Sequence, residues 1–242
     1  MDWHFALACL AATSHNCDVR PDPPFLGQAC VVTGASSGIG RAIAIALSEA
    51  GGVPVLVGRD KERLVEAVAA CPGEAEAAAF DLTDDDAVRR FVDTLPDRVG
   101  VVVHSAALAK AGASLDLPVD ELDRQFATNV RAPWVLNQAI MPRLEAARGQ
   151  VVFINSGAGL NARRDFSVYC VTKFGLRAYA DALREEINPR GIRVISVYPG
   201  RVDTPMQDDL LAFEGRTVPK HTLLTPPDVA YPTHAALSQA ET

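Results

Sequence analysis

The sequence predicts an α/β protein, a single domain in which a doubly wound, parallel β-sheet is covered by helices on both faces. Two observations predict this fold. Short, continuous runs of apolar and β-branched residues alternate along the chain with segments of helical periodicity. In addition, 48% of the 242 residues are hydrophobic, which is enough to cover both faces of such a sheet, and no linker divides the core.

The first 28 residues precede this alternating pattern. They contain the apolar stretch "HFALACLAATS" and end near the proline-rich stretch "RPDPPFLG", so we expect residues 1–28 to form a poorly ordered leader. A secretory signal peptide is the alternative, but no positive charge precedes the apolar stretch. The stretch is also far shorter than the roughly 20 residues that span a bilayer.

Two strand–helix pairs open the domain. The run "ACVVTGA" (29–35) is typical of a strand buried on both faces, and "GRAIAIALSEAG" (40–51) predicts a helix with one apolar face. The run "VPVLVG" (53–58) then predicts a second strand, and "DKERLVEAVAAC" (60–71) predicts a second helix.

The third pair is less clearly marked. The stretch "AEAAAFDL" (75–82) predicts only a weak strand, because alanine is not a strand-favouring residue. The stretch "TDDDAVRRFVDTL" (83–95) predicts a helix that begins with a capping box between Thr83 and Asp86. Its acidic residues lie where a helix N-terminus favours negative charge, which explains them without a metal ion.

The second half of the chain repeats the same order. Three further strands are expected in "GVVVHSAA" (100–107), in "QVVFINSGAG" (150–159, with its exit loop) and in "IRVISVYPG" (192–200). Long helices are expected between them, over 119–147 and 168–187. A repeated strand-then-helix order is typical of a parallel sheet with right-handed crossovers.

The stretch "TGASSGIG" (33–40) joins the first strand to the first helix. Gly34, Gly38 and Gly40 allow a tight turn and a close approach of the backbone to a diphosphate, which the free N–H groups of the helix N-terminus can bind. A glycine-rich turn without a ligand is the alternative, because such a motif alone is weak evidence. Its place between a strand and a helix favours a Rossmann-like dinucleotide site.

The end of the second strand indicates which dinucleotide binds. An acidic residue there would bind the 2′-hydroxyl of the adenosine ribose, but the chain has Gly58 followed by Arg59. The guanidinium of Arg59 suits a 2′-phosphate, which favours NADP(H) over NAD(H). Asp60 is close enough to leave NAD(H) open, although we expect Asp60 to begin the next helix.

Tyr169 and Lys173 indicate an acid–base catalyst. Residues four apart share one face of a helix, so both side chains can face one pocket, where the ammonium would lower the pKa of the phenol. Ser156 follows the fifth strand, at the edge of the sheet where ligands bind, and its hydroxyl can hydrogen-bond a substrate oxygen. Each residue alone also fits a structural role: a half-buried aromatic, a solvated lysine and a serine that caps a loop.

Taken together, these motifs resemble those of the short-chain dehydrogenase/reductase family over about residues 28–230. The resemblance rests on "TGASSGIG", Asp81 in "DL", Asn129 in "ATNV", Ser156 in "INSGAG", "YCVTK" (169–173) and "YPGRVDT" (198–204). It implies one Rossmann-type domain over 29–242, which transfers hydride between a nicotinamide cofactor and a small-molecule carbonyl or alcohol.

The resemblance also implies roles for individual residues. Tyr169 would be the acid and base, Lys173 would tune it and hold the nicotinamide ribose, Ser156 would position the carbonyl, and Asn129 would support a water chain. The residues expected to bind the cofactor are Gly34, Ser36, Ser37, Gly38, Ile39, Gly40, Arg59, Asp81, Leu82, Ser105, Ala106, Tyr169, Lys173, Pro199, Gly200, Val202 and Thr204.

The chain departs from the family pattern in two places. The loop "HSAA" (104–107) replaces the usual "NNAG", so Ala107 stands where a glycine lets the cofactor approach, and His104 is expected to be structural. After "TPPDVA" (225–230) the family usually completes a helix and a seventh strand, but here Pro232 is expected to interrupt the helix. We therefore expect the seventh strand to be missing and the sixth to be an exposed edge.

Composition and charge disfavour other classes of function. The net charge of −7 and the absence of a Lys/Arg-rich run predict no binding to nucleic acid or to a membrane surface. The five cysteines have neither the spacing of a zinc site nor that of a disulfide framework. They predict no metal, and reduced thiols in a cytoplasmic protein.

The predicted function is an NADPH-dependent oxidoreductase that reversibly reduces a carbonyl to an alcohol. The alternatives are a non-catalytic dinucleotide-binding regulator and an inactive, truncated relative. Residues 203–224 are expected to form a lid, in which Leu210, Leu211 and Phe213 favour an apolar substrate unless they pack on the body of the protein. A homodimer or homotetramer is predicted from apolar side chains on the long helices, such as Val168, Val171, Phe174 and Leu176.

Overall fold

The computed structural model describes residues 25–239 of the chain. Most of the expected leader, residues 1–24, lies outside the described residues. Phe25, which was assigned to this leader, is buried, and its ring lies edge-on to the ring of His234 with 5.7 Å between centroids. Phe25 therefore belongs to the packed domain, which was expected to begin at residue 29, because this side chain completes the core beside the last helix.

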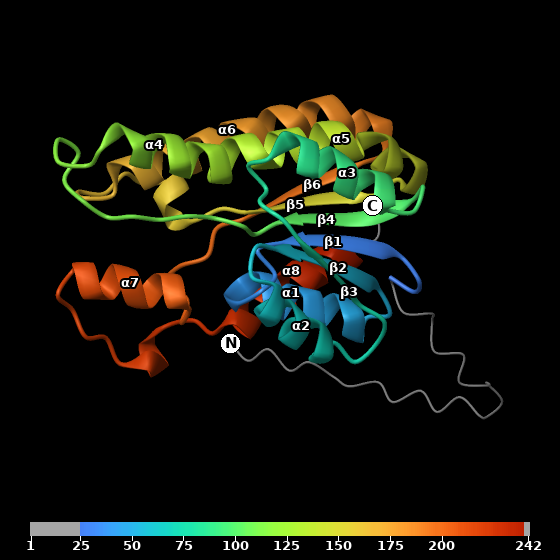
Figure 1. The fold of residues 1–242 in the computed structure, drawn as a ribbon, viewed down its shortest axis with the longest axis horizontal. Helices are drawn as coiled ribbons and strands as arrows, with labels where there is room; N and C mark the ends of the chain where they lie inside the picture. Colours follow the sequence, from blue (N-terminus) through green and yellow to red (C-terminus); the bar gives the residue numbers. More distant parts are fainter. Residues whose placement is uncertain (1–24, 240–242) are drawn as a thin grey trace, which may run out of the picture.

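Six parallel strands form one sheet, as predicted. They are β1 (Ala29–Thr33), β2 (Val53–Gly58), β3 (Glu76–Ala79), β4 (Val99–His104), β5 (Gln150–Ile154) and β6 (Arg193–Val197). Their order is β3-β2-β1-β4-β5-β6, so the direction of winding reverses between β1 and β4 (Figure 1). In an open α/β sheet, ligands bind at this point, outside the carboxyl ends of the strands.

Helices cover both faces of the sheet (Figure 1). One face carries α1 (Gly38–Glu49), α2 (Lys61–Ala69) and α8 (Pro226–Ser238), and the other carries α3 (Asp85–Thr94), α4 (Val119–Phe126), α5 (Ala132–Ala147) and α6 (Ser167–Ile187). Neighbouring strand residues alternate between the two cores: Val31 packs in the core on the α5 and α6 side, and Val32 in the core on the α1 side. No described helix is long and apolar enough to cross a membrane.

The helix expected over 119–147 is not continuous. A π-helical turn, Ala127–Arg131, separates α4 from α5. This turn directs the side chain of Asn129 inward, where its amide donates to the hydroxyl of Thr172 on α6 at 3.0 Å. Single π turns occur frequently at functional sites, and this one connects the α4–α5 layer with the helix that carries Tyr169 and Lys173.

The capping box expected between Thr83 and Asp86 is wrong. The N-cap of α3 is Asp84, whose carboxylate accepts hydrogen bonds from the backbone N–H groups of Asp86 and Ala87, both at 3.0 Å. Thr83 instead donates through its hydroxyl to Asp81 at 2.8 Å. Three consecutive aspartates compete for the cap here, and the register of the helix, which the sequence did not determine, selects the first of them.

The expected interruption at Pro232 is also wrong, because α8 continues through this residue to Ser238. Packing against α1 holds the helix, and two side chains from the sheet bind its last carbonyl groups. Gln150 donates to the carbonyl of Leu237 at 3.0 Å, and Arg193 donates to that of Ala236 at 2.9 Å. These contacts offset the one backbone hydrogen bond that proline removes.

As predicted, the described residues contain no seventh strand, and β6 is an edge of the sheet. This edge is partly covered by α6. The guanidinium of Arg184 donates to the carbonyl of Val194 at 3.1 Å and to the hydroxyl of Ser196 at 3.2 Å. A charged side chain over an edge strand reduces its tendency to pair with another chain.

Candidate functional site

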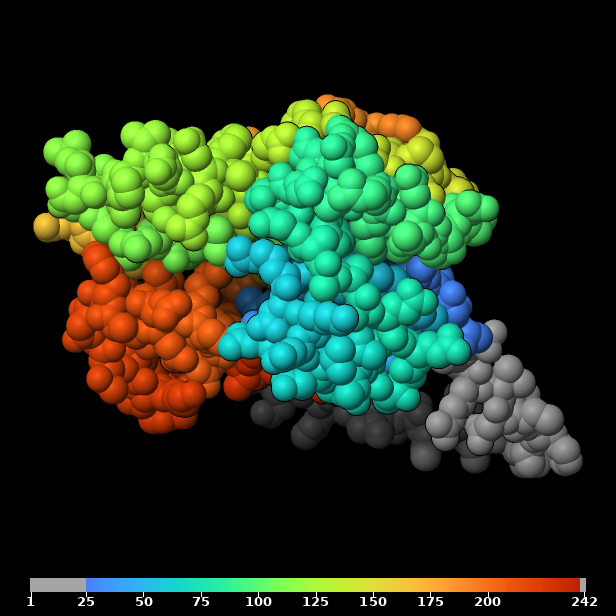
Figure 2. Space-filling model, viewed as in Figure 1, coloured from blue at the N-terminus to red at the C-terminus, as the bar shows by residue number. Residues whose placement is uncertain are grey.

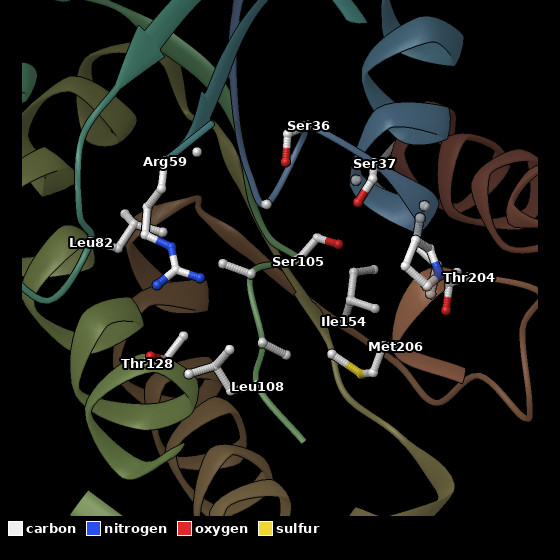
Figure 3. A pocket seen from close by; sticks show the side chains of 18 of the residues that line it. Ser36, Ser37, Arg59, Leu82, Ser105, Leu108, Thr128, Ile154, Thr204 and Met206 are labelled. Carbon is white, nitrogen blue, oxygen red and sulfur yellow. The ribbon is translucent and has the colours of Figure 1, made fainter. Parts of the chain in front are cut away.

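A cavity of about 310 Å³ lies at the carboxyl ends of the strands, where the strand order reverses (Figures 2 and 3). The glycine loop 34–40 forms one wall, and the loop 105–108 after β4 runs across the cavity. Tyr169 and Lys173 of α6 also line it. We call this space the first cavity.

The glycine loop is held by close packing of its backbone. Gly34 has φ +66°, and a Cβ atom there would lie 2.7 Å from the backbone of Ala106, so a side chain is excluded for two reasons. A Cβ atom at Gly40 would lie 2.5 Å from the carbonyl oxygen of Gly34. The role expected for these glycines, close approach to a ligand, is therefore accompanied by a structural one.

The start of α1 suits an anion. Ser37 is the N-cap but makes no side-chain capping bond, and the first turn contains no acidic residue. The N–H groups at this end therefore remain available to a phosphate, and the hydroxyls of Ser36 and Ser37 lie beside them (Figure 3). These residues fit the diphosphate of a dinucleotide.

The loop after β4 is fixed by Thr33. Its hydroxyl accepts the backbone N–H groups of Ser105 at 3.1 Å and Ala106 at 3.2 Å. Ala107, which stands where the resemblance predicted a glycine, lines the first cavity. His104, as expected, is structural: it is buried, bonds the amide of Asn137 at 2.8 Å, and burial lowers its pKa to about 4.

Arg59 and Asp81 line the far end of the first cavity, beyond β2 and β3. The guanidinium of Arg59 extends into the cavity (Figure 3) and forms no ion pair with any other described residue. Asp60, as expected, begins the next helix: its carboxylate accepts the N–H of Arg63 at 3.1 Å. The pKa of Asp81 is lowered, first by the hydrogen bond from the Thr83 backbone and also by the charge of Arg59.

Tyr169 and Lys173 lie together, as the helical spacing predicted, with the Lys173 Nζ atom 5.7 Å from the centre of the Tyr169 ring. The ammonium donates to the carbonyl of Ile154 at 3.0 Å. An ammonium has three donors, so two remain for a ligand, which fits the hydroxyl groups of a ribose. Burial lowers the pKa of Lys173 to about 8.

The expectation that Lys173 lowers the pKa of Tyr169 is wrong for the protein alone. Burial raises the pKa of Tyr169 to about 12, and the side chain of Ser156 opposes this rise only in part. The phenol is therefore protonated at neutral pH. The loss of hydration outweighs the hydrogen bond from Ser156 here, because the tyrosine side chain is almost completely enclosed.

Ser156 caps a loop, which is one of its two predicted roles, and its role toward a substrate oxygen stays a prediction. Its Oγ atom accepts the N–H of Ala158 at 3.1 Å, which caps the short turn after β5, and its hydroxyl interacts with Tyr169, whose pKa it lowers. Asn155, which the sequence analysis missed, holds this turn against α6: it donates to the carbonyl of Lys173 at 3.2 Å and accepts from the Ser156 backbone at 2.9 Å. Its place beside Ser156 in "INSGAG" was the available signal.

Asn129 lines neither cavity. Its Oδ1 atom accepts the N–H of Leu108 at 2.7 Å, and its Nδ2 atom donates to the carbonyl of Leu108 at 2.8 Å as well as to Thr172. Both amide hydrogens are thus engaged in holding the loop after β4 against α6. The proton-relay role that the resemblance implied for Asn129 stays a prediction.

A second cavity, of about 160 Å³, adjoins the first. Asn155, Tyr169 and Thr204 are among the residues that line both. Four residues expected in the site line only the second cavity: Ser156, Pro199, Gly200 and Val202. The lining residues that were not predicted for the site include Arg163, Phe166, Arg201 and Gln207.

The segment 203–224 contributes to both cavities. It contains α7 (Pro205–Phe213), which lies to one side of the sheet (Figure 1), and Thr204 and Met206 at its start line both cavities. The three apolar residues that suggested an apolar substrate are separated: Leu210 lines the second cavity, Leu211 is buried and Phe213 is exposed. They therefore do not form one apolar surface toward a substrate.

A comparison with known proteins identifies the family. The family model described as short chain dehydrogenase matches residues 28–215. The chain belongs to the short-chain dehydrogenase/reductase family. This dehydrogenase/reductase is 34% identical over 190 residues to the D-erythrulose reductase of Gallus gallus, covering 78% of this chain and 76% of that protein. It is 30% identical over 227 residues to the sepiapterin reductase of Chlorobaculum tepidum, covering 86% and 89%.

Solved structures of the family agree in fold with this dehydrogenase/reductase. A metagenomic short-chain oxidoreductase in complex with NADP superposes with a TM-score of 0.77 at 32% identity, over 90% of this chain and 93% of that one. A short-chain dehydrogenase from Shigella flexneri complexed with NADP superposes with a TM-score of 0.81 at 25% identity, over 90% and 94%. This short-chain dehydrogenase/reductase is thus a member of a family of NAD(P)-dependent oxidoreductases.

Proposed function

We propose that this short-chain dehydrogenase/reductase is an NADPH-dependent enzyme that reversibly reduces a carbonyl to an alcohol. One observation carries the proposal: Tyr169 lines both cavities, with Lys173 in the first and Ser156 in the second. A cofactor in the first cavity and a carbonyl in the second would therefore meet at the phenol. We also propose that the segment 203–224 is a lid, since Thr204, Gln207 and Leu210 line the second cavity.

The nicotinamide cofactor, when bound, supplies the hydride. The chain's own residues supply binding sites and the proton. Lys173 has two further N–H donors for the ribose, and the Ser156 hydroxyl, which interacts with Tyr169, would donate to the carbonyl oxygen. Tyr169, protonated at neutral pH, is in the correct state to donate its proton to that oxygen.

The preference for NADP(H) is proposed on the basis of Arg59. Ser36, Arg59 and Arg63 surround a shallow depression at the edge of the first cavity, and Asp60 there is engaged with Arg63 at 3.3 Å. Arg59 keeps its five donors for a ligand, which suits a 2′-phosphate. The related structures that contain NADP support this assignment.

Thermal denaturation with each cofactor tests the preference. We expect NADPH to stabilise the protein more than NADH, and Arg59→Gln to weaken NADPH binding by roughly tenfold or more, because it removes a charge-assisted contact to phosphate. Arg89→Gln, which changes an exposed arginine on α3 paired with Asp86, is the matched control and should behave like the wild type. Stronger stabilisation by NADH would reverse the assignment of Arg59.

Tyr169→Phe tests the enzymatic function. With a panel of ketones and aldehydes, we expect NADPH consumption by this variant to fall by roughly 10²- to 10⁴-fold, because the general acid is lost. NADPH binding, measured by the same thermal assay, should persist. If the wild type and Tyr169→Phe both bind NADPH and neither consumes it, the alternative of a non-catalytic dinucleotide-binding regulator is correct.

A further inference from the structure

We propose that the second cavity recognises a substrate with a carboxylate group, through Arg163, Arg201 and Gln207. This inference rests on the proposed function and names the substrate class: a short oxo acid, reduced to the corresponding hydroxy acid. The hydride of NADPH would go to the carbonyl carbon and the Tyr169 proton to the oxygen. The product keeps its carboxylate, and NADPH leaves as NADP⁺.

Charge in the second cavity favours an anion. Arg163 and Arg201 line it, whereas none of its described lining residues is aspartate or glutamate. Glu214 accepts from Arg201 Nη2 at 2.5 Å, and Arg216 lies 3.9 Å from its second oxygen. Arg163 also acts on Glu214, so this carboxylate is surrounded by three guanidinium groups.

Unused hydrogen-bond donors give the stronger argument. The Nη1 atom of Arg201 and the Nε2 atom of Gln207 are buried and have no hydrogen-bond partner among the described residues. Gln207 lines the second cavity, but only 7% of its surface is exposed to solvent. A buried donor without an acceptor is unfavourable, and a carboxylate can accept from both groups. The Oε2 atom of Glu214 is also buried without a partner, so two donors and one acceptor are unused in this wall and the donors are in excess.

The position of these donors defines the kind of substrate. Ser156 and Tyr169 line the same cavity, so a carbonyl at these hydroxyls would have its carboxylate toward Arg201 and Gln207. Phe166 and Leu210 also line the cavity and can contact the carbon atoms between the two groups. A volume of about 160 Å³ restricts that part of the substrate to a few carbons.

Matched pairs of acid and methyl ester test this inference. We would compare 4-oxopentanoate and 5-oxohexanoate with their methyl esters, which retain the carbonyl and lose the charge. Two quantities are measured: kcat/KM for NADPH consumption, and the Kd for the protein saturated with NADP⁺, by calorimetry. We expect the acid to be favoured over its ester by roughly tenfold or more in both.

Three variants test which residues produce the preference for the acid over its ester. Arg163→Gln removes one charge, and the pair Arg201→Gln with Glu214→Gln removes the unpartnered Nη1 donor of Arg201 without changing the net charge or leaving the glutamate unpaired. Both should reduce the acid-to-ester ratio by roughly tenfold. Arg89→Gln, an exposed arginine on α3, is the charge-matched control and should leave the ratio unchanged.

The outcomes separate this inference from the proposed function. Equal or undetectable binding of acid and ester, or a ratio that neither variant changes, would overturn the carboxylate site even if neutral carbonyls are reduced. Tighter binding of the acid that depends on Arg163 and Arg201, without any turnover, would support the carboxylate site and contradict the reductase.

Discussion

The charged ammonium group of Lys173 is buried, and this burial lowers the stability of the folded protein. Its side chain is 2% exposed and has one hydrogen bond, to the carbonyl of Ile154. Burial lowers its pKa from 10.5 to about 8, which means that the folded protein holds this proton less tightly than the unfolded chain does. The same enclosure keeps the ammonium close to the Tyr169 ring, so the group that would bind a ribose also destabilises the fold.

Lys173→Met should change how stability depends on pH. Below pH 8 the wild type carries the full cost of burying the charge. Between pH 8 and 10.5 the unfolded chain binds more protons than the folded one, so the stability of the wild type rises relative to the variant. The difference between the two pKa values corresponds to a change of about 3 kcal/mol in the free energy of unfolding of the wild type relative to the variant. Urea unfolding of both proteins from pH 7 to 10 measures it, and a constant difference would show that the lysine is not desolvated.

At the scale of elements, the sheet itself holds the last helix. Gln150 of β5 and Arg193 of β6 donate to carbonyl groups at the C-terminal end of α8, including those of Leu237 and Ala236. These carbonyl groups have no partner within a helix. The side-chain caps explain how α8 tolerates Pro232 and remains packed on α1 beside the exposed edge of the sheet.

Arg193→Met should therefore loosen α8. We expect the free energy of unfolding to fall by about 1–2 kcal/mol, because two hydrogen bonds from a charged group are lost. Hydrogen exchange should accelerate within 226–238. Arg89→Met on α3 removes only an exposed ion pair and should change stability by less than about 1 kcal/mol. Equal effects of the two substitutions would mean that the caps do not hold α8.

At the scale of the whole molecule, the α4–α5–α6 layer carries exposed apolar side chains. On α6, Val171 is 55% and Phe174 is 40% exposed, and Trp134 of α5 is also exposed. Leu176, which was expected on this surface, instead belongs to the core, because it faces the sheet. We retain the prediction of a homodimer or homotetramer, formed through the α4–α5–α6 layer.

Light scattering after gel filtration tests the assembly. We expect a mass that is a multiple of the 25.8 kDa chain, and the double variant Val171→Glu and Phe174→Glu should shift it toward a single chain, because charges would be buried in the interface. Val65 on α2 is 57% exposed and lies on the opposite layer, so Val65→Glu should leave the mass unchanged. A wild-type mass of one chain at micromolar concentration would contradict the prediction.

The sequence by itself determined the features that depend on neighbours along the chain. Alternating apolar runs predicted six strands and the helices between them, with errors of a few residues at the ends. The spacing of Tyr169 and Lys173 predicted a shared helical face, and Asp60 was correctly expected to begin α2. These properties follow from the helical period, from the pleat of a strand and from local capping, so no distant residue is needed to infer them.

Only the tertiary structure decided which distant segments meet and how deeply they are buried. Arg163, Arg201 and Gln207 come from separate loops and a helix, and nothing in their local sequence indicates that they line one cavity. The inward position of Asn129 and the raised pKa of Tyr169 depend in the same way on packing. The hydration and the hydrogen bonds of a side chain depend on the residues around it in space. Many of these residues are distant in the sequence and come together only when the chain folds.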